Sequence, residues 1–207
     1  MPAILLTAIA LVALAPHQRG DESLMRRRAH GTCQRPFAQT LRWSVDHATA
    51  DNICCFNRHY AEGSSSFSSN ALYMAEARRG GEITYYDSAT NKPLFVAPRG
   101  RTREAFLAES VQHGWPSFRD EEVLWENVRV LSDGETVSVD GTHLGHLIPD
   151  ASGPRYCINL CSVAGLGPAR RLTQDDMRRA LRSGGARGGG GLGMAAGGAV
   201  APQSFEI

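Results

Sequence analysis

The sequence lacks a strong net charge. Its 207 residues include 22 Lys and Arg against 21 Asp and Glu, which leaves a formal net charge of +1. No overall electrostatic field of the kind that draws a protein to nucleic acid or to an anionic membrane is therefore expected. Lys92 is the only lysine, and we assign no function to that scarcity. The length and a hydrophobic content of 42% are enough for one folded domain with tails.

A hydrophobic run long enough to cross a bilayer is not found either. Residues 3 to 15 read AILLTAIALVALA, which is too short to span a membrane and has the length of a signal-peptide core. Ala13-Leu14-Ala15 would suit a signal peptidase, although no Lys or Arg precedes the run and Pro16 follows it. We expect entry into the secretory pathway or an organelle, without stable membrane insertion. A cytoplasmic protein with an untrimmed N-terminus is the alternative.

Cysteine is sparse, and its usual zinc-binding spacing is missing. The sequence has five cysteines, an odd number that leaves at least one thiol unpaired if the others bridge. Five are too few for a disulfide scaffold, and no CxxC pair occurs. The cysteines are Cys33, Cys54, Cys55, Cys157 and Cys161.

Composition divides the chain into three parts. Residues 1–30 are expected to form a targeting segment followed by a polar linker, QRGDESLMRRRAH, in which apolar residues show no helical or strand period. Residues 31–165 mix apolar, aromatic and turn residues and are expected to form the domain. In residues 166–207, Thr173 and Asp176 resemble a capping box that begins one short helix. The Gly- and Ala-rich stretch 184–198 is expected to be disordered.

Local patterns predict a mainly β domain of short antiparallel strands with few helices. GEITYY has the alternating pattern of a strand, and PLFVAP is expected to form a second short strand after a turn. Asp133-Gly134 between two alternating segments predicts a second hairpin. Thr102 is expected to cap a helix over residues 102–112 whose apolar face contains Phe106, Leu107 and Val111.

The stretch HLGHLIPDASGPRYCINL, residues 143 to 160, gathers groups that carry chemistry around one cysteine. Arg155 and a protonated histidine would lower the pKa of the Cys157 thiol and make it a nucleophile. Two other interpretations remain open. Cys157 can be an inert core residue, or His143, His146 and Cys157 can be three ligands of a zinc ion.

Four motifs in this order, GWPSF, HLGH, PD and RYCIN, resemble those of the methionine sulfoxide reductase B family. The similarity runs from about Gly81 to Ala164, and further if ICCFNRHYAE belongs to the same domain. It implies two antiparallel sheets in a tent-like arrangement and reduction of methionine-R-sulfoxide in oxidised proteins or peptides. It also implies a cysteine sulfenic acid recycled by thioredoxin or a similar thiol, and no cofactor.

The resemblance also implies roles for individual residues. Cys157 matches the nucleophile, His143 and His146 would protonate the sulfoxide oxygen, and Asp150 and Asn159 would orient them. Arg155 matches a polar residue flanking the nucleophile. Trp115 and Phe118 of GWPSF match substrate-binding positions, where Trp115 would hold the methyl group against its ring. Plain core packing is the alternative for Trp115.

The sequence departs from the family at its metal and resolving positions. Many members carry four zinc cysteines, and Asp87, Thr90, Val137 and Asp140 align there instead, so we expect no structural zinc. Where other members read CGWPSF, this chain has His113. The usual thiol that reduces the sulfenic acid is therefore missing.

Other cysteines are candidates for that resolving step. If residues 155–163 form a strand, Cys157 and Cys161 lie about 13 Å apart, beyond the roughly 7 Å limit for a bridge. Cys54 and Cys55 on an extended segment would point to opposite faces, so that one of them can reach the site. Cys33 is a further candidate, and plain burial is the alternative interpretation of Cys54 and Cys55.

The missing resolving thiol also permits a rival function. The protein would then be an inactive binding module for an oxidised or methylated side chain.

Overall fold

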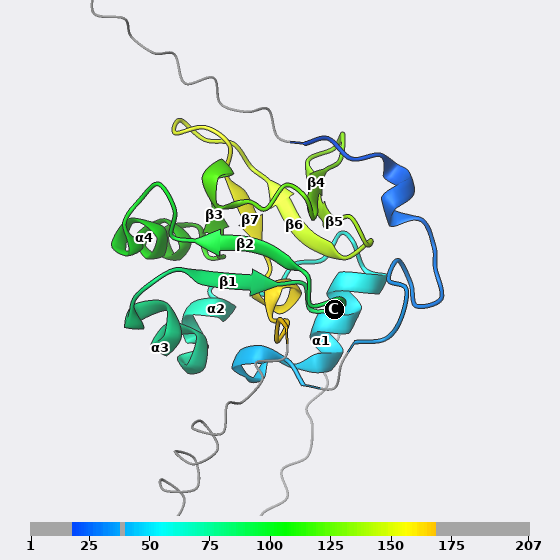
Figure 1. The fold of residues 1–207 in the computed structure, drawn as a ribbon, viewed down its shortest axis with the longest axis horizontal. Helices are drawn as coiled ribbons and strands as arrows, with labels where there is room; N and C mark the ends of the chain where they lie inside the picture. The colour runs from blue at the N-terminus through cyan, green and yellow to red at the C-terminus, as the bar shows by residue number, and fades with distance from the viewer. Residues whose placement is uncertain (1–17, 38–39, 169–207) are drawn as a thin grey trace, which may run out of the picture. The chain divides into compact units, whose positions relative to one another are not determined.

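The computed structural model describes residues 18–37 and 40–168. The expected signal segment, the helix after Thr173 and the glycine-rich tail lie outside these residues. The described chain is mainly β, with two antiparallel sheets and a few short helices, which confirms the predicted fold class (Figure 1). No helix among the described residues is long and apolar enough to cross a membrane.

The smaller sheet is the hairpin predicted from GEITYY and PLFVAP. It pairs β1 (Ile83–Tyr86) with β2 (Pro93–Ala97) in antiparallel register. The larger sheet has the order β3-β7-β6-β5-β4, and all its neighbours are antiparallel. Its strands are β3 (Ser117–Phe118), β4 (Val128–Val130), β5 (Glu135–Ser138), β6 (His143–Leu147) and β7 (Tyr156–Ile158).

The β4–β5 connection confirms the hairpin predicted from Asp133-Gly134. Gly134 has a φ of +93°, a left-handed conformation that glycine adopts without strain. The Asp133 carboxylate accepts a hydrogen bond from the Glu135 amide at 3.0 Å. These two local interactions fix where β5 begins.

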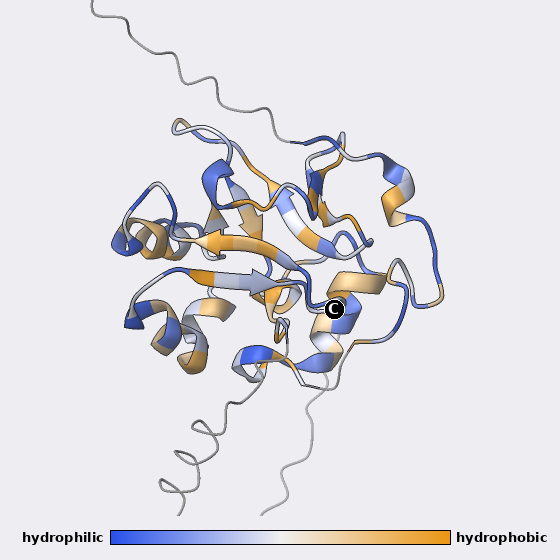
Figure 2. Cartoon of the chain, in the orientation of Figure 1, coloured by the Kyte–Doolittle hydropathy of each residue, from blue (hydrophilic) through white to orange (hydrophobic). Residues whose placement is uncertain are grey.

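One face of the larger sheet packs against the β1–β2 hairpin. Phe118 of β3 stacks on Phe95 of β2 at 4.4 Å between ring centroids and meets Tyr85 of β1 at 4.9 Å. All three rings are fully buried. Figure 2 shows β2 mostly in the hydrophobic colour, as expected for a strand that makes this contact. The aromatic cluster joins the two sheets into one core.

Helix α4 (Arg103–His113) confirms the predicted helix and its cap. The Thr102 side chain accepts a hydrogen bond from the Ala105 amide at 3.1 Å. Phe106 is buried against Phe118. The inclusion of Val111 in the apolar face was wrong, because 54% of Val111 is exposed.

Residues 18–30 are not a linker, in contrast to the prediction. Gly20 donates its amide to the Val130 carbonyl at 2.9 Å, and Val130 donates to the Gln18 carbonyl at 3.0 Å, so the segment extends the β4 edge. Met25, in a 3-10 helix (Glu22–Met25), packs with Val137. Backbone pairing of this kind leaves no apolar period in the sequence, which is why the polar composition misled the prediction.

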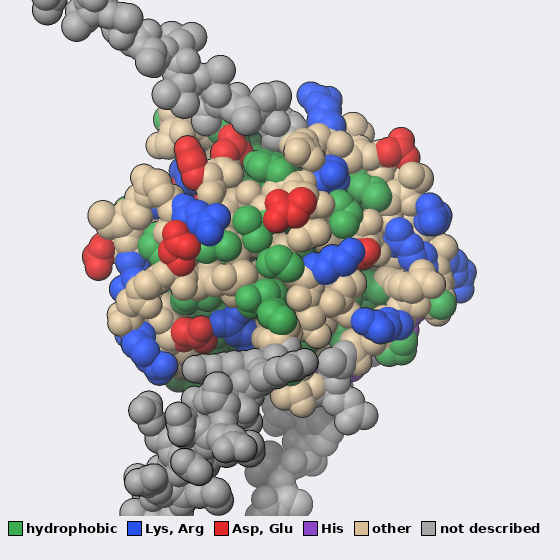
Figure 3. Space-filling view, in the orientation of Figure 1, with side chains coloured by type: hydrophobic (Ala, Val, Ile, Leu, Met, Phe, Trp, Pro, Cys, Tyr) green, Lys and Arg blue, Asp and Glu red, His purple; other side chains and the backbone are tan. Residues whose placement is uncertain are grey.

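Several short helices lie between residues 18–30 and the β1–β2 hairpin. It contains α1 (His47–Asp51), which continues as a π-helix (Asn52–Phe56), then α2 (Ser66–Ser69) and α3 (Ala71–Arg79). The expected extended conformation at Cys54 and Cys55 was therefore wrong. Further 3-10 helices are Arg42–Ser44, Asp120–Glu122 and Leu160–Val163. Side chains of both charge signs occur across the face seen in Figure 3.

Candidate functional site

A row of four residues crosses the larger sheet. Cys157 of β7 lies opposite Ser117 of β3 on one side and opposite His146 of β6 on the other. His146 in turn lies opposite Glu135 of β5. Side chains of directly opposed residues project from the same face of a sheet. The row therefore gathers a thiol, an imidazole and a carboxylate on the face that turns away from the aromatic core.

A bulge brings the second histidine to the same face. Residues three apart in a regular strand point to opposite faces, but the β5–β6 register shifts so that Leu144 has no partner on β5. The His143 and His146 ring centroids are consequently 5.5 Å apart. Gly145 makes this possible, because its φ is +156° and a Cβ there would lie 2.0 Å from the Cys157 carbonyl oxygen.

The carboxylate of Glu135 holds His143, a role that the sequence analysis missed. The His143 Nδ1 atom lies 2.7 Å from Glu135 Oε1, and both side chains are buried. Burial alone would raise the pKa of Glu135, but His143 and the Arg58 guanidinium, which also pairs with it, hold that pKa below its usual value. Glu135 thus stays ionised and fixes the His143 ring. No spacing motif marks Glu135, since it reaches His143 only through strand pairing.

A small cavity opens beside the row. It has a volume of about 140 Å³, below the roughly 300–1,000 Å³ of sites for drug-sized ligands, and suits the tip of one side chain. Its lining is mostly apolar around the thiol and imidazole. The lining residues are Ala61, Trp115, Gly145, His146, Ile148, Cys157 and Asn159.

A loop at Ala61 and Glu62 forms one wall of this cavity. The Trp115 indole donates to the Glu62 carbonyl at 3.0 Å, and the Glu62 amide donates to the Asn159 side chain at 2.9 Å. The Glu62 carboxylate accepts the Cys161 amide at 3.0 Å. Burial raises the pKa of Glu62, and that hydrogen bond opposes the rise. Glu62 was not among the predicted site residues, because nothing in its local sequence indicates these distant partners.

Burial keeps Cys157 and His146 uncharged. It raises the pKa of the Cys157 thiol, and the nearby Arg155 guanidinium opposes this. It lowers the pKa of His146, which the neighbouring His143 lowers further. At neutral pH the cavity therefore holds a neutral thiol beside a neutral imidazole, which can accept the thiol proton.

Three predicted site residues make other contacts than expected, although Asn159 does line the cavity. Asp150 does not orient the histidines; it pairs with Arg119 at 2.8 Å and with Arg155 at 3.3 Å. Asn159 bonds to the Glu62 amide and the Leu144 carbonyl rather than to a histidine. Phe118 is fully buried in the aromatic core on the other face of the sheet and cannot touch a ligand in the cavity.

The cysteines proposed as resolving thiols are also corrected. Cys55 forms a disulfide with Cys33, so neither is a free thiol. Cys54 and Cys161 are free but fully buried, and Cys54 donates to the Ser162 hydroxyl at 3.2 Å. The strand assumed for residues 155–163 ends at Ile158, and a 3-10 helix follows. The separation of about 13 Å predicted between Cys157 and Cys161 was therefore based on a strand that the structure does not contain.

The residues aligned with the zinc cysteines make other contacts in the structure. The Thr142 hydroxyl donates to the buried Asp87 carboxylate at 3.0 Å, and Lys92 pairs with Asp140 at 2.8 Å. Val137 is buried in the small cluster with Met25. Among residues 18–37 and 40–168, the side chains grouped closely enough to hold a metal do not include His143, His146 and Cys157 together.

No protein-family model matches this sequence.

Proposed function

We propose that the protein reduces methionine-R-sulfoxide in oxidised proteins or peptides through a sulfenic acid on Cys157. The observation that carries the proposal is that Cys157, His146 and Trp115 line one small cavity. A nucleophile, a proton carrier and an aromatic wall are the three elements that reduction of a methyl sulfoxide needs.

The opposed register of Cys157 and His146 supports a proton route. Cys157 Sγ attacks the sulfoxide sulfur while its thiol proton passes through His146 to the sulfoxide oxygen. The sulfur–oxygen bond breaks, methionine leaves, and the oxygen remains on Cys157 as a sulfenic acid. Cys157 thus gives up two electrons and the methionine sulfur gains them.

A dithiol completes the cycle. One thiol of thioredoxin or a similar reductant attacks the sulfenic acid, releases water and forms a mixed disulfide, which its second thiol then cleaves. Direct attack by the external reductant fits the cysteine inventory, because Cys54 and Cys161 are buried and Cys33 and Cys55 are already bridged. No cofactor takes part in these steps.

The cavity walls support recognition of a side-chain tip. The indole of Trp115 is fixed by its bond to the Glu62 carbonyl, so it presents a rigid apolar surface beside Cys157. Ile148, 46% exposed at the rim, adds apolar area. A methyl group would contact these walls while the sulfoxide oxygen faces His146.

The same cavity supports a second candidate, a binding module without turnover for an oxidised or methylated side chain. Burial raises the pKa of Cys157, and the free cysteines other than Cys157 in the described chain are buried. Both features favour a site that holds a ligand while Cys157 is neither oxidised by it nor reduced again by a second thiol of the chain.

One experiment separates the two. The protein is mixed with a peptide containing methionine-R-sulfoxide and with dithiothreitol, and the peptide mass is followed. Loss of one oxygen atom is expected, and Cys157→Ser should slow it at least roughly 10³-fold, because serine is a far weaker nucleophile. The S epimer serves as the matched control substrate. A peptide that binds but keeps its mass would contradict the reductase proposal and support the binding module.

A further inference from the structure

Cys33 and Cys55, which lie outside the cavity at Cys157, belong to a second cluster of chemically active groups. His30 and Cys33 close a four-residue turn, in which the His30 amide donates to the Cys33 carbonyl at 3.0 Å and the reverse bond measures 2.9 Å. Gly31 has a φ of +61°, and a Cβ there would lie 2.0 Å from the Cys55 carbonyl oxygen. The turn therefore presses closely against the helix that carries Cys55.

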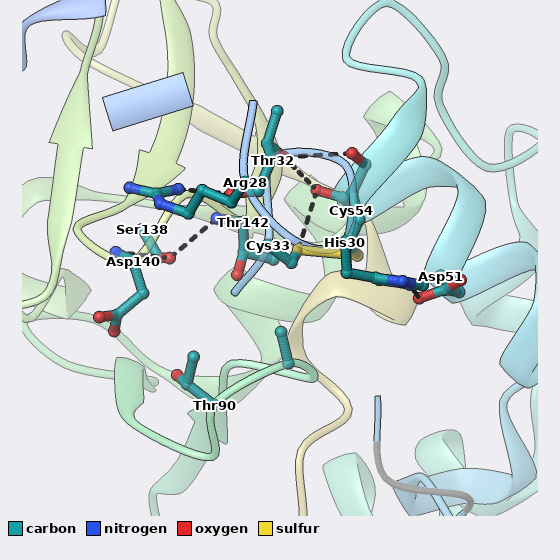
Figure 4. The surroundings of a disulfide bond; sticks show 12 residues. Arg28, His30, Thr32, Cys33, Asp51, Cys54, Thr90, Ser138, Asp140 and Thr142 are labelled. Carbon is teal, nitrogen blue, oxygen red and sulfur yellow. Dashed lines mark hydrogen bonds and ion pairs between the residues drawn. A yellow bond between two sulfur atoms is a disulfide. The ribbon is translucent and has the colours of Figure 1, made fainter. Parts of the chain in front are cut away.

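The helix contributes two more groups to the same point. Asp51 ends α1 and Cys55 lies in the π-helix that continues it. His30 Nε2 is 2.7 Å from Asp51 Oδ1. The donor atoms of His30, Asp51 and Cys55 all lie within 4.8 Å of one another. Figure 4 shows the His30–Asp51 pair beside the disulfide that joins Cys33 to Cys55.

We infer that reduction of the Cys33–Cys55 disulfide creates a zinc site whose ligands are His30, Cys33, Asp51 and Cys55. Two thiolates, an imidazole and a carboxylate are a tetrahedral zinc ligand set, with metal–sulfur distances of about 2.3 Å. The spacing His-x-x-Cys on a turn and Asp-x-x-x-Cys on a helix supplies two chelating halves. No CxxC pair marks this site in the sequence, because each half contributes a single cysteine ligand.

The redox step determines whether the site exists. In the disulfide each sulfur is bonded to the other and cannot bind a metal as thiolate. A dithiol reductant transfers two electrons to the disulfide, breaks the sulfur–sulfur bond and is itself oxidised to a disulfide, leaving two protein thiols. Zinc then displaces the two thiol protons. The Cys33 and Cys55 Cα atoms are 5.2 Å apart, so side-chain rotations suffice to place both sulfurs on one ion.

The two halves stay together without the disulfide. The Thr32 amide donates to the Cys55 carbonyl at 2.8 Å, and the Thr32 hydroxyl lies 3.3 Å from the same oxygen. The Phe56 and His30 rings pack edge to face with 4.7 Å between their centroids, which limits rotation of the His30 ring. Ligands held in place before the metal arrives lose less entropy on binding.

Solvent reaches this cluster through a cleft. The cleft has a volume of about 340 Å³ and is lined by His30, Gly31 and Cys55, among others. Arg27 and Arg28 also line it. Zinc with two thiolates and one carboxylate leaves a net charge of about −1, which these guanidinium groups can offset. The inference is independent of the reductase proposal, because none of the four ligands lines the cavity at Cys157.

The test compares the oxidised and reduced forms of the full chain. Each form is equilibrated with zinc alone, dialysed and analysed for metal, and cobalt(II) is bound in parallel to report the ligand geometry by its absorption. We expect one zinc per reduced chain, no stoichiometric zinc in the oxidised chain, and tetrahedral cobalt–thiolate bands on reduction. Equal zinc affinity of the two forms would overturn the inference.

Variants identify the ligands. Asp51→Asn and His30→Gln should each weaken zinc binding by the reduced chain roughly tenfold or more, while His59→Gln and Asp133→Asn serve as matched controls that should not. Cys157→Ser should also leave the affinity unchanged. The Cys33→Ser/Cys55→Ser variant should lose binding. If it retains full affinity, or if Cys157→Ser abolishes binding, zinc is held by other thiols and the assignment is wrong. Circular dichroism confirms that each variant is folded.

Discussion

His146 and Cys157 lie directly opposite each other on the antiparallel strands β6 and β7. This pairing places an imidazole beside a thiol without the help of a flexible loop, since both side chains leave the same face of the sheet. Burial keeps both groups uncharged, because it lowers the pKa of His146 and raises the pKa of Cys157. In our proposal the proton moves between them only when a substrate fills the cavity.

Replacing Glu135 should impair proton transfer without weakening substrate binding. Glu135→Gln removes the negative charge at the His143 ring, so kcat should fall about tenfold or more. KM should change little, because Glu135 does not line the cavity. Steady-state kinetics across a pH series would measure both, with the exposed Glu126→Gln as control. A rise in KM at constant kcat would contradict the positioning role.

Gly145→Ala should destabilise the fold strongly, and Gly153→Ala should destabilise it only slightly. Both glycines have positive φ, +156° and +111°, so both substitutions introduce backbone strain. Only at Gly145 would the new Cβ also meet a backbone oxygen, that of Cys157. We expect a loss of about 2–4 kcal/mol in the free energy of unfolding for Gly145→Ala and about 1 kcal/mol for Gly153→Ala. Denaturant titration measures both losses. Equal losses would show that the backbone shifts enough to relieve the contact between the new Cβ and the Cys157 carbonyl oxygen.

Removing the disulfide should cost stability and spare the first turnover. Cys33 and Cys55 are 22 residues apart, and a loop of that size is expected to contribute about 3 kcal/mol. The Cys33→Ser/Cys55→Ser variant should unfold at lower denaturant concentration. It should still convert one methionine sulfoxide per enzyme in a single-turnover assay, because neither sulfur lines the cavity. Cys161→Ser is the control for a buried free thiol, and loss of the first turnover in the disulfide variant would refute a structural role.

Asp150 should stabilise the fold above about pH 4 and not below about pH 2. The hydrogen bond from Arg119 lowers the pKa of Asp150 from 3.8 to about 2. Since this folded-state pKa is below the unfolded value, the contribution is complete above the unfolded pKa and disappears as pH falls through the folded one. The melting temperature of Asp150→Asn should therefore lie below that of the wild type near neutral pH, and the gap should close in acid. A gap that persists unchanged at about pH 2 would show that the charge is not the cause.

The sequence by itself predicted the elements that depend on neighbouring residues. Asp133-Gly134 indicated a hairpin, Thr102 indicated a helix cap, and the structure has both. GEITYY and PLFVAP likewise indicated two strands, and these pair as β1 and β2.

Only the tertiary structure decided which distant residues meet. His143 and His146 share a face because the register shifts at Leu144, and Glu135 reaches them through strand pairing. The bridge between Cys33 and Cys55, and the pairing of residues 18–20 with β4, likewise join segments far apart in the chain. Local propensity acts over a few residues, whereas register and packing are chosen by the burial of the whole core. For that reason the partners of the site could not be predicted from the sequence around Cys157.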